Sequence, residues 1–546
     1  MIGRITRASR LFVFIICIVM IFVACEPIDK VIGFFADDGT GHIFKIALET
    51  DPKNLDPQIA DDASSITVSK NLFAGLMDYD ENGKLVGRMA EDYFISADGL
   101  TYTFYIKEGY KWHALGNYEA PVTAGDFVFG FRRLMDPKTA SPHSDKYFCI
   151  KNAEAARKGE LSPSEIGVEA IDDKTLQFTL EYPNAEFLYL LAELPAMPCC
   201  EDFFNSAGGK YGLEAEAVCS NGPFYVRYWL HDPYGKNNYV RLRRNQGYSD
   251  ASFVSAGGIN FLITSDAEER YSDFIGGDTD AIIYPSGTYA AIDGDEYVAG
   301  YADVAGIIFN EKSEIFKAVE VRQVFSWAVD REVLADSSPD ILLPAEGMIP
   351  TSPILTAKGY SPRIPEDVGT TNLAMAEYKW SFLLTERQKS SLIGMSVMVP
   401  SDFGYADCLT ALTDSWYSVF GTHISIDIAS PRDYAERLKS GDYDIALAVL
   451  SSDSGNAIDY IKPFGKSKEY GISLQTVISA ENGVGHYDSM TALNYACSEG
   501  ENAVLSDYHF VPLWQLPSVC CYDGDCEDIR FDAFSKTAYF ENAKSF

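Results

Sequence analysis

Basic residues are scarce in this sequence. Its 44 lysines and arginines stand against 79 aspartates and glutamates, which gives a formal net charge of -35 at pH 7. A surface this acidic repels phosphate backbones, so we expect no binding to nucleic acid. An acidic excess is also typical of an ordinary soluble surface, and by itself it does not indicate an electrostatic partner.

The sequence also lacks the short motifs of the common enzyme and metal-site classes. It has only seven histidines, no two of them at a metal-ligand spacing, and no Cys-x-x-Cys pair. The GxSxG, GxxxxGK and GxGxxG patterns are absent as well. Paired carboxylates do occur, but 79 acids make chance pairs inevitable. We therefore expect no catalytic residue, no cofactor and no metal ion, with a hydrolase kept as an alternative.

Long hydrophobic runs are missing except at the N-terminus. Residues 11–24 are uncharged and apolar, and the ten residues before them contain three arginines and no acid. Such a run is too short to span a bilayer comfortably, so residues 1–24 are predicted to be a signal peptide. Ala24 followed by Cys25 resembles a bacterial lipobox, in which the cysteine is lipidated and becomes the first residue of the mature chain.

A lipidated Cys25 would place the body of the protein on the extracytoplasmic face of the cell membrane, which is the periplasmic side in a Gram-negative host. Residues 25–42 have no clear periodicity and are expected to form the tether. An uncleaved membrane anchor is the alternative, and it leads to the same compartment.

Eleven cysteines are present, of which Cys17 lies in the signal peptide and Cys25 is the predicted lipidation site. The other nine are an odd number, so outside the cytoplasm at least one of them stays a free thiol even if all the others form disulfides. The pairing cannot be derived from the sequence. The remaining nine are Cys149, Cys199, Cys200, Cys219, Cys408, Cys497, Cys520, Cys521 and Cys526.

The length of 546 residues exceeds what one hydrophobic core usually holds, so we expect two or more lobes. Residues 102–106 and 176–180 alternate apolar and polar side chains, as strands do. Residues 127–134 and 321–329 place apolar side chains at helical spacing. Strands mixed with helices predict an α/β or mixed α+β fold.

Several segments, taken in order, resemble the family 5 extracellular solute-binding proteins of ABC importers, the oligopeptide- and dipeptide-binding group. The first are a Leu-Asp-Pro turn at residues 55–57, the helix end "NLFAGL" and the hairpin "DGLTYTF". The helix "APVTAGDFVFGFRRLMDP", the strands "SNGPFYVRYW" and "RRNQGYSD", and the helix "VRQVFSWAVDREVL" then follow. The resemblance extends from about residue 43 to residue 532, and the ordered series is more specific than any one segment.

This resemblance implies a fold of two lobes joined by crossing strands, with a ligand enclosed between the lobes and an extra subdomain on the first. We expect lobe I to comprise residues 43–80, 218–300 and 515–546, the extra subdomain residues 81–217, and lobe II residues 301–514. The resemblance also implies a monomeric receptor without catalytic activity, which captures oligopeptides and delivers them to the permease and ATPase subunits of an ABC transporter.

One candidate site residue follows the apolar run "DIALAVL", which predicts a buried strand. The next segment, "SDSGNAIDYIKPF", aligns without a gap to a family stretch in which Asp453 falls on the family's Asp. The resemblance implies that Asp453 receives the N-terminal ammonium of a peptide, whose pKa near 8 keeps it mostly protonated at neutral pH. The alternative is that Asp453 only caps the turn that follows.

Five further residues are candidates on the same basis. Leu450, Ser451 and Ser452 are expected to offer backbone groups to an extended ligand. Asn221 and Gly222, at a strand turn near the expected hinge, would line the other side of the ligand, with a plain turn as the alternative.

Near these candidates the sequence departs from the family pattern. Ser454, Asn456 and Ala457 replace the common Tyr, Asp and Pro, and Ala74 stands where many members carry Glu. These departures leave other ligands open, namely a chelated metal, an opine or a short sugar. A sensor of a peptide pheromone that does not import its ligand is a further alternative.

Overall fold

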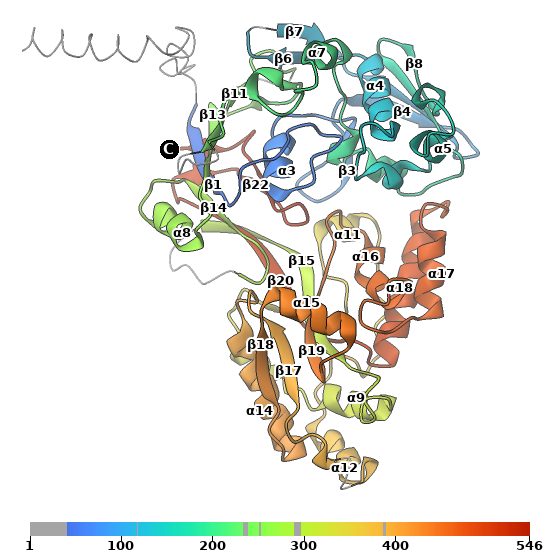
Figure 1. Ribbon diagram of the computed structural model, residues 1–546, viewed down its shortest axis with the longest axis vertical. Helices are drawn as coiled ribbons and strands as arrows, with labels where there is room; N and C mark the ends of the chain where they lie inside the picture. Colours follow the sequence, from blue (N-terminus) through green and yellow to red (C-terminus); the bar gives the residue numbers. More distant parts are fainter. Residues whose placement is uncertain (1–40, 117, 233–237, 250–252, 289–295, 386–388) are drawn as a thin grey trace, which may run out of the picture.

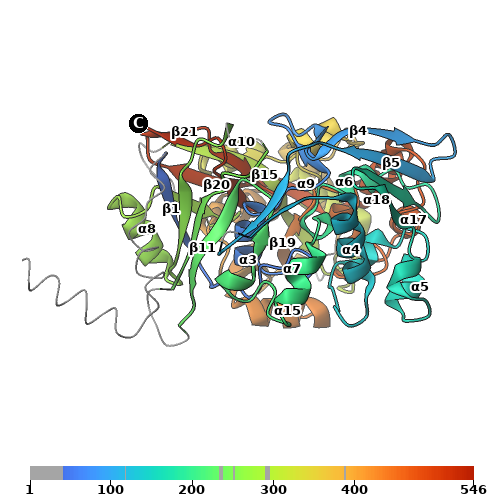
Figure 2. The ribbon, with the colours of Figure 1, turned by 90° about the horizontal axis from the view of Figure 1, so that it is seen from above.

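The computed structural model describes residues 41–116, 118–232, 238–249, 253–288, 296–385 and 389–546. The predicted signal peptide, Cys25 and nearly all of the predicted tether lie outside these residues. The described chain forms two lobes, with the first above the second in Figure 1. Seen from above, β4 and β5 lie at the opposite end of the first lobe from β1 (Figure 2).

One continuous sheet of eleven strands runs through both lobes. Its two longest strands, β15 (Glu296–Phe309) and β20 (Val511–Tyr522), pair antiparallel and pass from one lobe into the other (Figure 1). On the first-lobe side the order is β11 (Phe224–Leu230), β12 (Tyr239–Arg244), β13 (Gly258–Ile263), β1 (Ile43–Leu48) and β14 (Ala281–Tyr284). On the second-lobe side it is β19 (Ile445–Ser451), β17 (Ser396–Pro400) and β18 (Ser425–Ala429), while β16 (Leu343–Pro344) pairs with β20.

A second sheet, of four antiparallel strands, extends the first lobe. Its order is β4 (Ala90–Ile95), β5 (Thr101–Ile106), β9 (Thr175–Thr179) and β8 (Val168–Asp172). The predicted strand alternation is confirmed, because Tyr102, Phe104 and Ile106 of β5 are all buried. Helix α4 (Ala124–Met135) begins after Thr123, which forms a capping box with Asp126, and it packs on this sheet.

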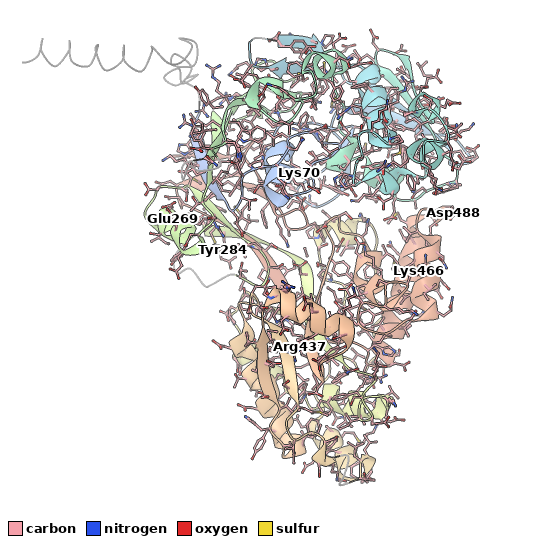
Figure 3. All side chains as sticks on the ribbon, in the orientation of Figure 1. Lys70, Glu269, Tyr284, Arg437, Lys466 and Asp488 are labelled. Carbon is pink, nitrogen blue, oxygen red and sulfur yellow. The ribbon has the colours of Figure 1, made fainter. Side chains whose placement is uncertain are left out.

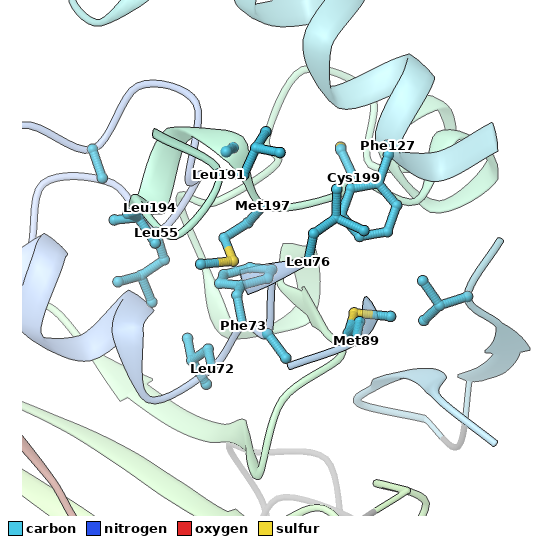
Figure 4. Packing of buried hydrophobic residues seen from close by; sticks show 14 of the residues in the cluster. Leu55, Leu72, Phe73, Leu76, Met89, Phe127, Leu191, Leu194, Met197 and Cys199 are labelled. Atoms are coloured by element: carbon cyan, nitrogen blue, oxygen red, sulfur yellow. The ribbon is translucent and has the colours of Figure 1, made fainter. Parts of the chain in front are cut away.

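The core of the first lobe joins segments that are distant in the sequence. Phe73 and Leu76 follow helix α3 (Ala63–Lys70), and they lie beside Met197 and Phe127 (Figure 4). Gly75 allows this close approach, because a β carbon at that position would lie 2.8 Å from the sulfur of Met197.

The second lobe has one core on each face of its part of the sheet. Along β15, Ala305, Ile307 and Phe309 belong to one core, and Val304 and Ile308 belong to the other. The first core is covered by α9 (Val319–Trp327), α10 (Arg331–Asp336), α12 (Leu373–Leu383) and α14 (Leu409–Phe420). The second is covered by α11 (Pro353–Ala357), α16 (Ala457–Ile461), α17 (Gln475–Gly483) and α18 (Met490–Ser506). A strand covered on both faces is apolar throughout, which explains the run "DIALAVL" in β19.

This mixed arrangement of helices and strands in two lobes confirms the predicted fold class. The nine cysteines in the described part of the chain are buried thiols rather than disulfides. Among the described helices, none combines the length and the apolar character needed to cross a membrane. Within the same residues, no group of His, Cys, Asp and Glu side chains is arranged to hold a metal ion.

Candidate functional site

A pocket of about 620 Å³ lies between the two lobes. The first lobe lines it with side chains from residues 145–149 and 182–193, and the second lobe with side chains from residues 451–466 and 481–485. Figure 3 shows Lys466 on the second-lobe side. Because both lobes contribute, a ligand in this pocket would touch both of them.

The loop after β19 is held by its own hydrogen bonds. The Ser452 hydroxyl donates to Asp459 Oδ2 at 2.7 Å and accepts from the backbone N–H of Asn456 at 3.1 Å. Gly455 adopts a left-handed conformation with φ of 64°, which favours glycine. These contacts fix the loop where it leaves the sheet, and they fix the position of Asp453 within it.

A lysine from another segment of the second lobe fastens the same loop. Lys358, at the end of α11, is buried, and its Nζ donates to the carbonyl oxygen of Gly455 at 2.9 Å and to Oδ1 of Asn456 at 2.6 Å. Burial lowers the pKa of Lys358, although the carboxylate of Glu186 in the first lobe opposes that effect. The loop is therefore held from two sides, by Ser452 and by Lys358.

Asp453 is exposed and lines the pocket. No residue in the described ranges donates a hydrogen bond to its carboxylate or forms an ion pair with it. The turn is held by Ser452, and α16 begins at Ala457 without a side-chain cap. The Asp453 carboxylate is therefore available to a ligand.

The charges that line the pocket are unequal. The acidic side chains are those of Asp145, Glu186, Glu193, Asp453, Asp459 and Glu481, and the basic ones are those of Lys146, Lys462 and Lys466. Two of the three lysines are already paired, because Lys146 Nζ lies 2.6 Å from Glu193 Oε2 and Lys462 Nζ lies 2.6 Å from Asp459 Oδ1. The remaining excess of carboxylates favours a ligand with positive groups.

The pKa of Lys146, in the first lobe, depends in part on acids of the second lobe. Burial alone would lower its pKa, but attraction to Glu193, Asp459 and Asp453 outweighs burial and raises it. Since Asp453 and Asp459 belong to the second lobe, Lys146 attracts two acids on the opposite wall of the pocket.

The lobes make direct contact beside the pocket. The backbone N–H of Ala185 donates to the carbonyl oxygen of Tyr487 at 2.9 Å. The rings of Tyr182 and His486 lie 3.9 Å apart between centroids. Because Tyr182 also lines the pocket, this contact forms part of its boundary.

The predicted residues around Asp453 are brought together only in part. Ser451 and Ser452 line the pocket with Asp453. Leu450 is only 1% exposed, pairs with Val304 of β15, and is not among the lining residues. A backbone contact between Leu450 and a ligand stays a prediction.

Asn221 and Gly222 lie in the first lobe and are not among the residues that line this pocket. Asn221 is fully buried, accepts a hydrogen bond from the backbone N–H of Ala74 at 3.0 Å and donates one to the carbonyl oxygen of Ala74 at 2.8 Å. Gly222 packs so closely that a β carbon there would lie 2.7 Å from the carbonyl oxygen of Leu72. Their role in ligand binding stays a prediction.

No pattern in the sequence points to Lys146, Glu186 or Lys358. Lys146 lies in the short 3-10 helix η1 (Ser144–Tyr147), Glu186 lies in the turn before α6, and no motif marks either residue. Lys358 follows a short helix, and its partners are mostly backbone carbonyls, which leave no pattern in a sequence.

Comparison with known proteins agrees with this architecture. Residues 84–471 match the model of the bacterial extracellular solute-binding proteins, family 5. The oligopeptide-binding protein OppA of Bacillus subtilis (strain 168) is 26% identical over 431 residues, which are 77% of this chain and 76% of that protein. A protein of Escherichia coli (strain K12) named "Probable deoxycholate-binding periplasmic protein YgiS" is 25% identical over 439 residues, or 78% of each chain.

A solved structure shows the same fold. The periplasmic murein tripeptide-binding protein MppA, in its unliganded open form, superposes with a TM-score of 0.70 at 19% sequence identity, and the match covers 93% of this chain and 98% of that one. The likeness confirms the predicted fold of two lobes with an extra subdomain on the first.

Proposed function

The chain belongs to the bacterial extracellular solute-binding proteins of family 5, and we propose that it is a receptor that captures oligopeptides and delivers them to an ABC transporter. Members of this family bind solutes rather than transform them. In this proposal the protein performs no chemistry, acts as a monomer, and works on the extracytoplasmic side of the membrane.

The observation that carries the proposal is the carboxylate of Asp453, which lies between the lobes without a partner among the described residues. A peptide brings an N-terminal ammonium that is mostly protonated at neutral pH. Enclosing that charge without a counter-charge would cost several kcal/mol. Asp453 supplies the counter-charge at the end of β19, where a loop fixed by Ser452 and Lys358 holds it in place.

An extended peptide with its amine at Asp453 would run past the end of β19. Ser451 is exposed there and lies in the pocket, next to the buried Ser452. In the proposal, backbone groups of Leu450, Ser451 and Ser452 pair with the backbone of the peptide, and Asn221 and Gly222 lie toward its other side. Pairing through backbones would permit many peptide sequences.

Delivery requires that the receptor stay near its transporter. In the proposal, Cys25 carries the lipid and the residues after it form the tether, while the two lobes present a closed, loaded receptor to the permease. The ATPase subunits then drive import.

A second ligand class is suggested by the relative YgiS, whose name refers to deoxycholate. Deoxycholate is an anion at neutral pH, and the pocket of this chain has six carboxylates against three ammonium groups. This charge balance favours a ligand with positive groups over an anionic steroid. Four further hypotheses compete with peptide uptake, namely binding of a chelated metal, an opine or a short sugar, and sensing of a peptide pheromone without import.

Native mass spectrometry of the purified protein tests the proposal. We expect bound masses that correspond to short peptides, and calorimetric titration with trialanine should show saturable binding of one molecule per chain. A bound mass that belongs to a steroid, a metal chelate or a sugar, together with no heat from any peptide, would contradict the proposal. Trialanine recovered intact by mass spectrometry after incubation would show that the protein is not a peptidase.

A further inference from the structure

Glu186 is a buried acid of the first lobe that faces the second lobe. It precedes helix α6 (Phe187–Leu190), and its backbone N–H donates to Asn184 Oδ1 at 2.9 Å. The side chain is 6% exposed, does not cap the helix, and lines the pocket. Its backbone is therefore fixed while its carboxylate is directed to the space between the lobes.

This carboxylate has no partner in the described part of the chain. No described side chain or backbone group donates a hydrogen bond to it or pairs with it, and burial raises its pKa. Lys358 is the cation that opposes this effect, but the ammonium of Lys358 is bonded to the loop after β19 and forms no ion pair with Glu186. Buried acids are seldom left unpaired, and because this one lines the pocket, its carboxylate is available to a positive group of a ligand.

The other charges of the pocket do not supply this group. Lys146 is paired with Glu193, and Lys462 is paired with Asp459. Lys466 is exposed and forms no ion pair with Glu186. Asp459 itself adds to the raised pKa of Glu186, because it is a like charge on the opposite wall. Glu186 and Asp453 are thus two acids, one on each lobe, that lack a described partner in the same pocket.

We propose that Glu186 receives a second positive group of the ligand, so that the site selects peptides that carry a basic side chain as well as a free N-terminus. The inference rests on the proposed peptide binding. Asp453 and Glu186 line the same pocket from opposite lobes, so in this proposal a peptide bound at Asp453 directs a lysine or arginine side chain toward Glu186. It would donate a charge-assisted hydrogen bond to an acid that is already desolvated. A ligand that bridges both acids would also hold the lobes together.

The competing explanation is that Glu186 only steadies the buried Lys358 across the gap between the lobes. The two explanations differ in what they predict for the isosteric variant Glu186→Gln. If Glu186 serves Lys358, the variant should melt at a lower temperature and lose affinity equally for all peptides. If Glu186 serves the ligand, the melting temperature without peptide should not fall, and only basic peptides should lose affinity.

The test is calorimetric titration of the wild type, Glu186→Gln and Asp488→Asn with six tripeptides. Three are trialanine with lysine at the first, second or third position, and three carry the uncharged norleucine at the same positions. Asp488→Asn is the matched control, because Asp488 is an exposed acid of the second lobe that stands next to Tyr487 and does not line the pocket (Figure 3).

We expect the wild type to bind at least one lysine peptide about tenfold or more tightly than its norleucine counterpart, as for a hydrogen bond between charged groups. Glu186→Gln should lose this preference and Asp488→Asn should keep it. Equal binding of lysine and norleucine peptides by the wild type, or a preference that survives in Glu186→Gln, would overturn the inference while peptide binding stands. If none of the six peptides binds, the proposed function fails and this inference fails with it. Should Glu186→Gln not fold, Glu186→Met gives the same comparison.

Discussion

The ammonium of Lys358, in the second lobe, lies 5.0 Å from the centroid of the Tyr189 ring, in the first lobe. The same ammonium donates to the carbonyl oxygen of Gly455 and to the side chain of Asn456, in the loop that carries Asp453. One buried cation therefore joins the candidate binding loop to the opposite lobe. The position of that loop and the approach of the two lobes are thus physically linked.

Lys358→Met should weaken ligand binding and lower stability. The methionine keeps the apolar volume but removes the donors that hold the loop, and a hydrogen bond from a charged group contributes about 1.5–3 kcal/mol. We expect the melting temperature to fall by a few degrees and the affinity for trialanine to fall by about tenfold, because Asp453 is no longer held in place. Thermal denaturation and calorimetry measure both. Lys439→Met, an exposed lysine of helix α15 (Pro431–Ser440), is the control and should change neither.

The strand that leads to the site could be predicted because its physical cause is local. Residues 445–450 of the segment "DIALAVL" are all apolar, since β19 is covered by a hydrophobic core on each face of the sheet. The alternation in β5 and the helical stripe of α4 follow from the same rule. Asp453 is identified by family resemblance, and it does line the pocket.

The opposite wall could not be predicted, because it depends on where two lobes meet. Glu186, in a turn, and Lys146, in a short 3-10 helix, stand in ordinary local sequences, and their significance comes only from facing residues 451–485 across the pocket. Asn221 is the opposite case, a residue that the sequence singles out but that does not line the pocket. Its amide lies at a strand turn, as expected from the sequence, yet in the structure it bonds the backbone of Ala74.

Ligand binding should bring the lobes closer together. The pocket is lined from both lobes, so a ligand that contacts both walls favours the closed arrangement. Small-angle scattering should show a smaller radius of gyration with saturating peptide than without it. The melting temperature should rise as well, since a hundredfold excess over the Kd adds about 2.7 kcal/mol to the stability of a protein that binds only when folded. An unchanged radius with a raised melting temperature would indicate binding without closure.

The proposed lipid anchoring depends on Cys25, which lies outside the described part of the chain. Cys25→Ala should abolish incorporation of labelled fatty acid and should leave the protein uncleaved or released from the membrane. Cys17→Ala, which lies within the predicted signal peptide, is the control and should leave lipidation intact. Labelling of equal strength on the Cys25→Ala protein would show that the lipid, if any, is attached elsewhere.

An ion pair in the first lobe should make stability depend on acid pH. Lys70 Nζ lies 3.1 Å from Asp532 Oδ2, and the Ser535 hydroxyl donates to the same carboxylate at 2.6 Å. Burial alone would raise the pKa of Asp532, but Lys70 and Ser535 outweigh burial and lower it. The pKa is thus lower in the folded than in the unfolded protein, where it is about 3.9. The stabilisation is complete above that value and is lost as the pH falls through the lower, folded-state pKa.

Asp532→Asn should therefore be less stable than the wild type at neutral pH, by about 2–4 kcal/mol, because Lys70 loses its counter-charge. The difference should shrink as the pH falls from about 5 to about 2, which urea denaturation at a series of pH values would show. Asp528→Asn removes a surface partner of Lys544 and should have little effect at any pH. A difference between Asp532→Asn and the wild type that stays constant with pH would show that the charge of Asp532 does not contribute.

Asp453 itself should control the affinity for a free peptide amine. Asp453→Asn keeps the shape of the side chain and removes its charge, so an enclosed ammonium would lose its counter-charge. A hydrogen bond to a charged group contributes about 1.5–3 kcal/mol, and leaving a buried charge unpaired costs about 3–5 kcal/mol. Affinity for trialanine should fall by about tenfold to a thousandfold. Affinity for N-acetyl-trialanine should change little, because that peptide has no ammonium to lose.

The ratio of the two affinities separates this role from a structural one. The wild type should prefer the free over the acetylated peptide, and Asp453→Asn should lose most of that preference, whereas Asp488→Asn should retain it. If Asp453 only steadied the turn, Asp453→Asn would melt a few degrees lower and keep the ratio. The hydrogen bonds already weigh against that outcome, since Ser452 and Lys358 hold the turn and no described residue bonds the carboxylate of Asp453. A ratio that survives in Asp453→Asn would mean that another acid receives the ammonium, and Glu186 would then be the residue to test.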